Sequence, residues 1–432
     1  MRVLVVGGGG REHALAWKIA RSPRVDAVLA APGSDAIAAC ATCFPEIKAT
    51  DSAALIELAR AEGIGLVVIG PEDPLAAGLA DRLREAGIPA FGPSAFAAQL
   101  ESSKSFAKRF MARHGIPTAD FHEFSDFEAA RGHVRKLGGG CVVKADGLAA
   151  GKGVAVCSTP DEAERALVEI MQDRRFGDAG SAVVIEELLI GEEVSYYAIS
   201  DGEHIATLAP AQDHKRALDG DRGENTGGMG AYSPVALVTE AIERRIISEI
   251  VEPTVRGMAA EGHPFTGVLY VGLMIDADRA PRVVEFNVRF GDPETQPLMV
   301  RMQDDLFPIL YGSALGKLDP VDSPTRWGQA AVCVVIASDG YPRSYEKGVP
   351  IEGLAELEGD PDVVVFHAGT RRHPAGSFVT TGGRVLGVTA RGRDVAEAAA
   401  RAYAAADRIR FRGMRLRRDI AATRRNTRCS VQ

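Results

Sequence analysis

Three polar side chains share one face of a predicted strand in the second half of the chain. Over Val283–Arg289, strand alternation places Glu285, Asn287 and Arg289 on one side and apolar residues on the other. A carboxylate and an amide oxygen at neighbouring same-face positions suit Mg²⁺, which prefers hard oxygen ligands and keeps waters that it shares with phosphates. The arginine one step further can hold a carboxylate or a phosphate through its planar fork. The alternative is an ordinary half-exposed strand.

A second candidate is a glycine-rich stretch that follows a predicted strand ending at Lys144. It is not a Walker A loop, because that motif needs glycine where Asp146 stands and Ser or Thr where Gly153 stands. A mobile loop between two strands can instead fold over a triphosphate. Lys144 would then counter the phosphate charge, while loop amides bind oxygens. A solvent-exposed hairpin with incidental lysines is the alternative.

The chain begins with a buried strand, four glycines (Gly7–Gly10) and a helix. Backbone amides at such a turn, with the helix dipole behind them, can bind a phosphate. Dinucleotide binding is disfavoured, because the G-x-G-x-x-G/A pattern needs Gly or Ala where Glu12 stands. Residues Ala31–Ser34 also offer no carboxylate for a ribose at the end of the next strand. Binding of a phosphate or polar substrate and a purely structural glycine turn stay equally open.

Two further segments carry polar groups. Acidic residues end the predicted strand Ala182–Glu187. Its backbone can pair with an adenine edge and a later carboxylate can bind ribose, although a solvated acidic turn is the simpler interpretation. The predicted loop Asp213–Pro234 carries five glycines. A loop of this length inside a compact domain is usually functional.

The elements that must position these groups alternate strand and helix over residues 1–100. Apolar runs predict strands at Val3–Val6, Ala27–Ala30 and Leu66–Ile69, and a single helix is predicted over Leu75–Ala86. This alternation predicts a parallel sheet with right-handed crossovers. Beyond residue 100, strands are predicted at Cys141–Lys144, Val154–Cys157, Leu269–Ile275, Arg282–Phe286, Ala331–Ala337, Val363–Phe366 and Arg384–Val388, and helices at Lys104–Arg113, Asp161–Met171 and Val395–Arg408.

Composition narrows the class of protein. The 432 residues suggest two to four domains at ~100–200 residues each. The apolar share of 46% supports packed cores, and a net charge of −8 does not favour a nucleic-acid or anionic-membrane surface. No stretch reaches the ~18 apolar residues of a membrane span. Cys40 and Cys43 form a lone C-x-x-C pair, which is a weak metal signal, so a reduced cytoplasmic enzyme is expected.

Together these segments resemble the ATP-grasp ligases, and within them the phosphoribosylamine–glycine ligase family. The resemblance covers essentially the whole chain, with GGGGREHALAWK, KADGLAAGKGV, QDHKR, GENTGGMGAYSP and EFNVRFGDPETQP in the family's order. The last two motifs are distinctive for this family among ATP-grasp proteins. Gly8 departs from the serine of many relatives, and the tail after Ile420 is idiosyncratic.

The resemblance implies an ATP-grasp architecture that combines α/β and α+β parts. It implies an N-terminal parallel α/β substrate-binding domain at residues 1–103. An ATP-grasp domain follows at 104–325, with a lid over 121–193, and then a C-terminal α+β domain at 326–432.

The resemblance also implies roles at matching positions for ATP and metal. The ATP-binding residues would be Lys104, Lys144, Gly147, Gly151, Gly153, Glu186, Glu187, Leu189 and Glu193. The lysines would hold the phosphates, the glycines would shape the lid, and Glu193 would hold the ribose. Glu285 and Asn287 would bind Mg²⁺, with Mn²⁺ as a substitute.

Further roles concern catalysis and the other substrates. Arg289, Lys144 and Lys104 would be the catalytic residues, next to the transferred phosphoryl group. The substrate-binding residues would be Gly8, Gly9, Gly10, Asp213, Lys215, Thr226, Gly227, Gly228, Met229, Arg289, Asp292 and Glu294. The histidines, including His13 and His214, are expected to be structural or positioning groups rather than bases.

The implied reaction is the ATP-dependent ligation of glycine to 5-phosphoribosylamine through glycyl phosphate, in de novo purine synthesis. The resemblance implies a cytoplasmic monomer with small-molecule substrates and neither nucleic-acid nor membrane partners. A related ligase that uses formate or bicarbonate is the nearest alternative. An NAD-dependent oxidoreductase and a non-catalytic nucleotide-sensing module are the alternatives from other classes.

Overall fold

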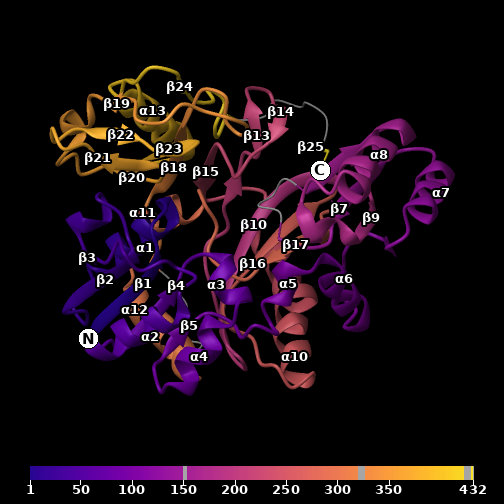
Figure 1. Cartoon of the computed structure of the whole chain (residues 1–432), viewed down its shortest axis with the longest axis horizontal. Coiled ribbons are helices and arrows are strands. Elements are labelled where there is room, and N and C mark those ends of the chain that lie inside the picture. The colour runs from indigo at the N-terminus through magenta and orange to yellow at the C-terminus, as the bar shows by residue number, and fades with distance from the viewer. Residues whose placement is uncertain (149–152, 320–325, 423–429, 432) are drawn as a thin grey trace.

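The computed structural model describes residues 1–148, 153–319, 326–422 and 430–431. The first hundred residues form a parallel sheet in the order β3-β2-β1-β4-β5 (Figure 1). Its strands are β1 (Arg2–Gly7), β2 (Ala27–Pro32), β3 (Thr42–Cys43), β4 (Leu66–Ile69) and β5 (Ala90–Phe91). Strand β1 is buried on both faces, which explains its continuous apolar run. The predicted parallel α/β unit is confirmed.

Helices α1 (Gly10–Ile19) and α2 (Ser52–Ala61) connect these strands as expected. The prediction of one helix over Leu75–Ala86 is wrong, because the structure has α3 (Glu72–Ala76) and α4 (Leu79–Glu85). Gly78 lies between them with φ +80°. This left-handed conformation, which glycine adopts without a steric penalty, breaks the helix in two.

A separate lobe, at the right of Figure 1, contains a sheet in the order β6-β9-β7-β8. Its elements are β6 (Phe121–Phe124), α7 (Phe127–Leu137), β7 (Cys141–Ala145), β8 (Val154–Cys157), α8 (Pro160–Leu167) and β9 (Val183–Glu187). The helix predicted over Asp161–Met171 is α8 followed by a wider π-helical turn, Val168–Gln172. On β7, Cys141, Val143 and Ala145 belong to the core of this lobe. Alternation therefore puts Lys144 on the opposite face of the strand.

The middle of the molecule is an antiparallel sheet in the order β11-β10-β16-β17. It comprises β10 (Ile190–Asp201), β11 (Ile205–Thr207), β16 (Thr266–Ile275) and β17 (Pro281–Asn287). The helices of this region are α5 (Gln99–Ser102), α6 (Lys104–Arg113), α9 (Glu240–Ile246), α10 (Glu252–Ala260), α11 (Thr295–Arg301) and α12 (Leu306–Leu315). One apolar cluster joins the N-terminal sheet to this central sheet, so the two pack as one body.

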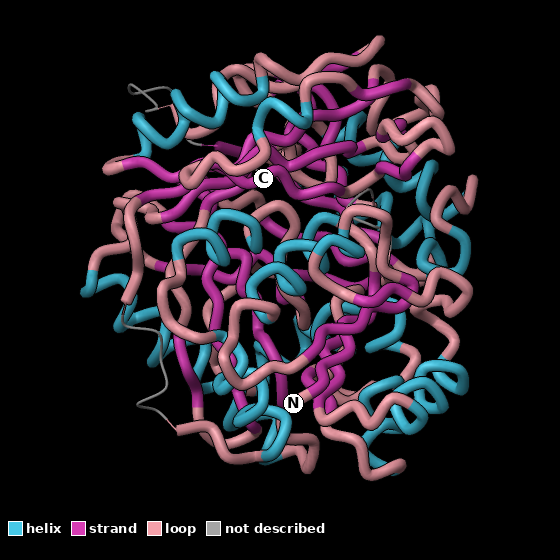
Figure 2. The backbone as a smooth tube through the Cα atoms, turned by 90° about the vertical axis from the view of Figure 1, so that its left-hand side faces the viewer, coloured by secondary structure: helices cyan, strands magenta, loops and turns pink. Residues whose placement is uncertain are grey.

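The C-terminal sheet has the order β12-β15-β18-β23-β20 and includes strands from the middle of the chain. They are β12 (Gln212–Asp213), β15 (Gly230–Ser233), β18 (Ala330–Ser338), β20 (Val363–His367) and β23 (Arg384–Gly392). Helix α13 (Val395–Ala406) packs on β18 and β23. Strands β19 (Pro350–Ile351), β21 (Thr370–Arg372) and β22 (Phe378–Thr380) form a small sheet nearby, and β24 (Met414–Arg415) pairs with β18. Figure 2 shows this lobe stacked above the N-terminal one.

The expectation of a long loop over Asp213–Pro234 is wrong. The segment contains β12, a hairpin of β13 (Arg216–Leu218) and β14 (Arg222–Asn225), and β15. Strand β15 pairs with β18, about a hundred residues further along the chain. Local sequence pattern carries no signal for such a partner, which is why the strands were not predicted. Within the described ranges, no helix combines the length and apolar character needed to cross a membrane.

Candidate active site

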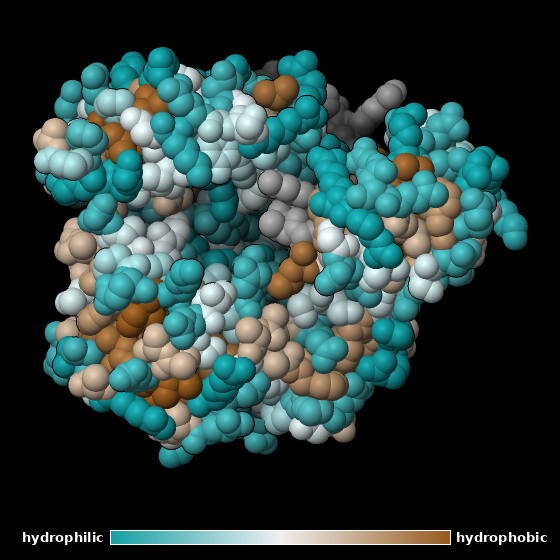
Figure 3. Space-filling view, in the orientation of Figure 1, coloured by the Kyte–Doolittle hydropathy of each residue, from teal (hydrophilic) through white to brown (hydrophobic). Residues whose placement is uncertain are grey.

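A cavity of about 940 Å³ lies between the N-terminal sheet, the lobe of the β6-β9-β7-β8 sheet, the central sheet and the C-terminal sheet. Figure 3 shows a hollow with hydrophilic walls at the centre of the molecule. Many of the predicted site residues line the cavity: Lys104, Lys144, Gly153, Glu186, Glu193, Asp213, Lys215, Thr226, Gly227, Glu285, Asn287, Arg289, Asp292 and Glu294.

The two lysines predicted to hold phosphate reach the cavity from different elements. Lys104 begins α6, and its Nζ donates to the Gly147 carbonyl at 3.0 Å. Lys144 on β7 lies 2.9 Å from Glu186 Oε1 and donates to the Val284 carbonyl at 3.1 Å. Burial lowers the pKa of Lys104, and the nearby Glu285 opposes that shift. The cavity thus presents two ammonium groups from separate lobes.

A third lysine, Lys108, was not predicted from the sequence. It lies one helical turn after Lys104 on α6, and its Nζ is 3.0 Å from Glu186 Oε2. The buried Glu186 carboxylate is therefore shared by Lys108 and Lys144. Burial lowers the pKa of Lys108 to about 8, although Glu186 raises it. The i, i+4 spacing from Lys104 was the available signal.

Glu285 on β17 is the carboxylate predicted to bind a metal. Burial alone would raise the pKa of Glu285. The positive charges of Lys215, Lys144 and Lys104 outweigh this effect and lower the pKa to about 2. Lys215 lies 3.7 Å from Glu285 and also forms an ion pair with Glu193. The Glu285 carboxylate is therefore ionised at neutral pH, as metal binding requires.

Arg289, directly after β17, is held by its neighbours on several sides. Its Nη2 lies 2.8 Å from Glu101 Oε1 and donates to Asn287 Oδ1 at 3.0 Å. Its Nε donates to Glu72 Oε2 at 3.2 Å. Burial lowers the pKa of Arg289, but Glu101 and Glu72 raise it above its ordinary value. Neither carboxylate was predicted, because both lie some two hundred residues before Arg289 in the sequence.

Another part of the cavity wall, which includes Asp213 and Glu294, is acidic. Tyr270 Oη donates to Glu294 Oε1 at 2.7 Å, and Ser195 Oγ donates to the same oxygen at 3.3 Å. Burial raises the pKa of Asp213 well above its usual range, although Lys215 lowers it. A protonated carboxyl at Asp213 can donate a hydrogen bond as well as accept one.

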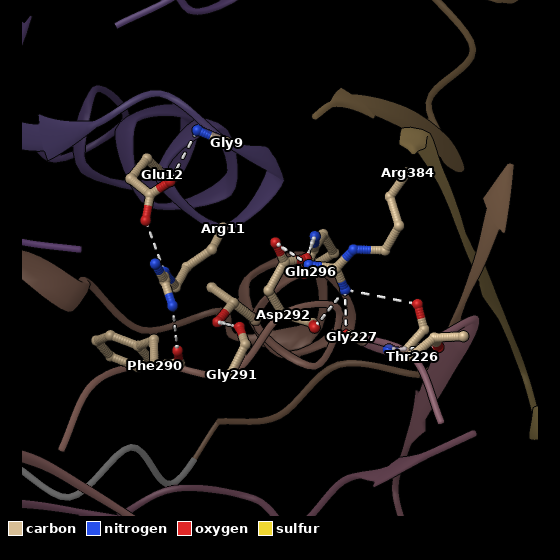
Figure 4. Close-up of polar contacts among 12 residues, drawn as sticks. Gly9, Arg11, Glu12, Thr226, Gly227, Phe290, Gly291, Asp292, Gln296 and Arg384 are labelled. Atoms are coloured by element: carbon tan, nitrogen blue, oxygen red, sulfur yellow. Dashed lines mark hydrogen bonds and ion pairs between the residues drawn. The ribbon is translucent and has the colours of Figure 1, made fainter. Parts of the chain in front are cut away.

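The predicted glycine loop does not line the cavity. The Gly9 amide donates to Glu12 Oε2 at 2.8 Å, and Glu12 Oε1 accepts from Arg11 Nε at 2.6 Å (Figure 4). Arg11, which does line the cavity, also donates to the Phe290 carbonyl at 3.1 Å. The protein's own carboxylate thus binds the Gly9 amide. A Cβ at Gly8 would lie 2.3 Å from the Gly33 carbonyl oxygen, so the backbones approach closely there.

Several other predicted residues are not among those that line the cavity. This group comprises Gly8, Gly9, Gly10, Gly147, Glu187, Leu189, Gly228 and Met229. Gly151 falls outside the described residues. His13 is a structural group, since its Nδ1 accepts the His367 amide at 3.0 Å. Burial, with His367 as a second cause, lowers the pKa of His13 to about 3.

Three family models cover most of the chain. The model described as the N domain of phosphoribosylglycinamide synthetase matches residues 1–101. The ATP-grasp (A) domain of the same family matches residues 102–295, and its C domain matches residues 331–423.

The sequence is also similar, over nearly all of its length, to those of known phosphoribosylamine–glycine ligases. The phosphoribosylamine–glycine ligase of Agrobacterium fabrum is 54% identical over 420 residues, covering 97% of this chain and 98% of that protein. That of Neisseria meningitidis serogroup A is 51% identical over 427 residues, covering 98% and 99%.

The fold is also similar to those of solved structures. The phosphoribosylamine–glycine ligase of Thermotoga maritima superposes with a TM-score of 0.82 at 32% identity, covering 97% of this chain and 100% of that one. The biotin carboxylase of Campylobacter jejuni, at 15% identity and a TM-score of 0.72, shares the fold. The predicted combination of α/β and α+β parts in an ATP-grasp architecture is thereby confirmed, and the chain belongs to the phosphoribosylamine–glycine ligase family.

Proposed function

We propose that this chain ligates glycine to 5-phosphoribosylamine, with conversion of ATP to ADP and phosphate, in purine biosynthesis. One observation carries the assignment of residues. Lys104, Lys144, Glu285 and Asn287 share a single cavity with Arg289 and the segment Asp213–Gly227. A nucleotide-binding half and a substrate-binding half thus meet in one space.

In the nucleotide half, Lys104 and Lys144 bind the phosphates of ATP. Their ammonium groups neutralise charge on the moving phosphoryl group, which is the main demand of phosphoryl transfer. Glu193 accepts hydrogen bonds from the ribose, and Glu186, Glu187 and Leu189 border the adenine. Lys215 forms an ion pair with Glu193 and lies 3.7 Å from Glu285, so its positive charge lies between these two carboxylates.

Glu285 and Asn287 fit a divalent cation. The Glu285 pKa of about 2 keeps that carboxylate ionised, and Asn287 adds a hard amide oxygen. Two protein ligands suit Mg²⁺, which keeps several waters and takes phosphate oxygens as its other ligands. We propose Mg²⁺ as the metal, with Mn²⁺ as a substitute. When bound, the ion offsets negative charge on the phosphates.

In the substrate half, Arg289 lies beside the glycine carboxylate. A carboxylate oxygen attacks the γ-phosphorus, ADP leaves, and glycyl phosphate forms. The amine of 5-phosphoribosylamine then attacks the acyl carbon, phosphate leaves, and the nitrogen loses a proton. Acyl phosphates hydrolyse readily, so closure of the lid lobe, residues 121–193, serves to exclude water. Asp213, Asp292 and Glu294 supply acceptors for the amine and the sugar hydroxyls.

We also propose three domains, at residues 1–103, 104–325 and 326–432, in a monomer that works in the cytoplasm. The ranges of the three family models support this division. The described cysteines are free thiols, as expected in a reducing compartment. Sedimentation velocity at micromolar concentration tests the monomer, and a dimer would contradict it.

The metal assignment is tested by Glu285→Gln, which keeps the shape of the side chain and removes its charge. We expect the turnover number to fall by more than the ~10–100-fold that loss of an outer-shell partner causes. Glu249→Gln, at a surface ion pair with Arg245, is the matched control. Glycine-dependent ADP release is measured against Mg²⁺ concentration. Near-normal turnover of Glu285→Gln would refute the metal site.

The choice of acid is tested separately with the wild-type chain. ADP release is measured with 5-phosphoribosylamine and glycine, formate or bicarbonate in turn. We expect turnover with glycine alone. Turnover with formate or bicarbonate and none with glycine would reject the proposed reaction.

A further inference from the structure

Arg384, the first residue of β23, reaches from the C-terminal sheet to the substrate half of the cavity. Its Nη1 donates to the Asp292 carbonyl at 2.6 Å and to the Gly227 carbonyl (Figure 4). Its Nη2 lies 3.0 Å from Asp292 Oδ2. One guanidinium group therefore joins two segments that the sequence assigned to substrate binding, Thr226–Met229 and the turn after β17.

Both backbone polar groups of Gly227, its amide and its carbonyl, bind side chains of the C-terminal lobe. Its amide donates to Tyr341 Oη at 2.9 Å, while its carbonyl accepts from Arg384. A Cβ at Gly227 would lie 3.1 Å from Arg384 Cζ, so the guanidinium packs directly against the backbone. The next residue, Gly228, contacts the other segment, because a Cβ there would lie 2.4 Å from Pro293 Cδ.

The charges in this cluster are already paired. Asp292 Oδ2 accepts from Arg384, and Asp292 Oδ1 accepts from Gln296 Nε2 at 2.8 Å. The ion pair between Arg384 and Asp292 is four-fifths shielded from solvent on both sides. Arg384 thus has a carboxylate and two carbonyls as acceptors, divided between its two terminal nitrogens, whereas a lysine would have to reach all three from a single nitrogen.

We infer that Arg384 is a positioning residue for the ligation step. It fixes Thr226–Gly228 and Phe290–Pro293 relative to each other, so that the acid and the amine meet in the correct geometry. The inference rests on the proposed assignment of these two segments to the substrates. Among the described residues, the hydrogen bonds and ion pair of Arg384 go to Gly227, Gly228 and Asp292 and not to the residues assigned to the nucleotide. Loss of Arg384 should therefore affect the substrate half of the site.

Loss of Arg384 should therefore affect the kinetics for glycine and 5-phosphoribosylamine but not those for ATP. In Arg384→Ala we expect kcat/KM for glycine and for 5-phosphoribosylamine to fall about 100-fold, the loss that a displacement of ~1 Å can cause. The KM for ATP should change less than about twofold, since the nucleotide contacts stay in place. Arg384→Lys should resemble the alanine variant. The control is Arg401→Ala, which removes ion pairs with Asp362 and Glu397 on the same lobe and should keep all three constants.

Chemical rescue separates positioning from loss of folding. Guanidinium chloride at low millimolar concentration should restore part of the turnover of Arg384→Ala and leave Arg401→Ala unaffected, whereas sodium chloride at equal ionic strength should not. Tyr341→Phe, which removes the acceptor of the Gly227 amide, should produce a weaker loss of the same kind. Its effect should be less than additive with that of Arg384→Ala, because both act on Gly227.

Two results would overturn the inference. One is a rise in the KM for ATP equal to the rise for the other substrates, and the other is wild-type kinetics in Arg384→Ala. A different result bears on the proposed reaction itself. If the wild-type chain releases ADP at the same rate without glycine, the substrates are wrongly assigned, whatever Arg384 does.

Discussion

Several charged side chains in this cavity share their ion-pair partners. Glu186 lies between Lys108 and Lys144, and Arg289 lies between Glu72 and Glu101. A shared partner keeps a buried charge compensated from two directions, which limits the side chain to one position. Lys144 and Arg289 are therefore each held by neighbours that also line the cavity.

Glu101 tests this arrangement at the scale of one residue. Glu101→Gln keeps an acceptor for the Val288 amide, 2.8 Å away, but leaves Arg289 with a single carboxylate. We expect the free energy of unfolding to fall by about 2 kcal/mol, since a buried charge loses a partner. We expect kcat/KM for glycine to fall about tenfold or more, because Arg289 is less well fixed.

The control for this prediction is Glu164→Gln, at a surface cluster with Arg131 and Arg135. It should leave both the denaturation midpoint and the kinetics unchanged. Equal behaviour of the two variants would show that Glu101 has no special connection to the site.

Single residues could be predicted where a local pattern exposed them. Glu285 and Asn287 follow the strand alternation that the sequence shows directly, although the strand ends at Asn287 and Arg289 lies two residues beyond it. Glu101 and Glu72 could not be found, because nothing near them signals an ion pair with a residue so distant. Arg384 was hidden for the same reason, although its strand was predicted.

Elements were predictable where a continuous run of residues determines them. Strands β1, β2 and β4 are apolar runs between helices, and they were predicted with small shifts in their bounds, whereas the two-residue strands β3 and β5 were not among the predicted strands. The break between α3 and α4 was missed because Gly78 interrupts a run that is otherwise typical of one helix. The strands within 213–234 were missed because their partners lie elsewhere in the chain.

Two glycines of opposite character test this account of helix continuity. Gly78→Ala should lower the free energy of unfolding by about 1 kcal/mol, because its φ of +80° is unfavourable for any side chain. Gly132 lies inside α7 without positive φ, and a Cβ there meets nothing within 4 Å. Gly132→Ala should therefore raise the free energy of unfolding by about 0.5–1 kcal/mol. Urea denaturation measures both, and effects of the same sign would contradict the account.

At the scale of the whole molecule, the N-terminal and C-terminal lobes meet at a pair of buried histidines. His13 on α1 accepts the backbone amide of His367 on β20. Burial lowers the pKa of His13 to about 3, with His367 adding to the shift, and lowers that of His367 to about 4, with Arg372 adding to it. Both rings are neutral in the folded protein at neutral pH, and protonation of either is unfavourable at this contact.

The sign of the pH dependence follows from these values. Above about pH 6.5 neither the folded nor the unfolded chain is protonated at these rings, so they contribute no slope. As the pH falls from about 6.5 toward 4, the unfolded chain takes up protons that the folded chain does not. Stability should then decline by up to about 1.4 kcal/mol per pH unit for each histidine.

His13→Asn tests this dependence, because the asparagine oxygen can accept the His367 amide but does not titrate. Denaturant midpoints between pH 4 and 7 should fall less steeply in this variant than in the wild type. The exposed His373 provides the control, and His373→Asn should keep the wild-type slope. Identical slopes for His13→Asn and the wild type would exclude the histidine contact as a source of acid lability.

The sheet that combines β15 with β18 affects the order in which the chain can fold during synthesis. Strand β15 ends at Ser233, whereas its partner β18 does not begin until Ala330. At ~5–20 residues per second, a ribosome needs roughly 5–20 s to make the intervening chain. Throughout that interval the edge of β15 has no β18 to pair with. The sheet that contains β15 can therefore be completed only after β17, which carries Glu285 and Asn287, has already been made.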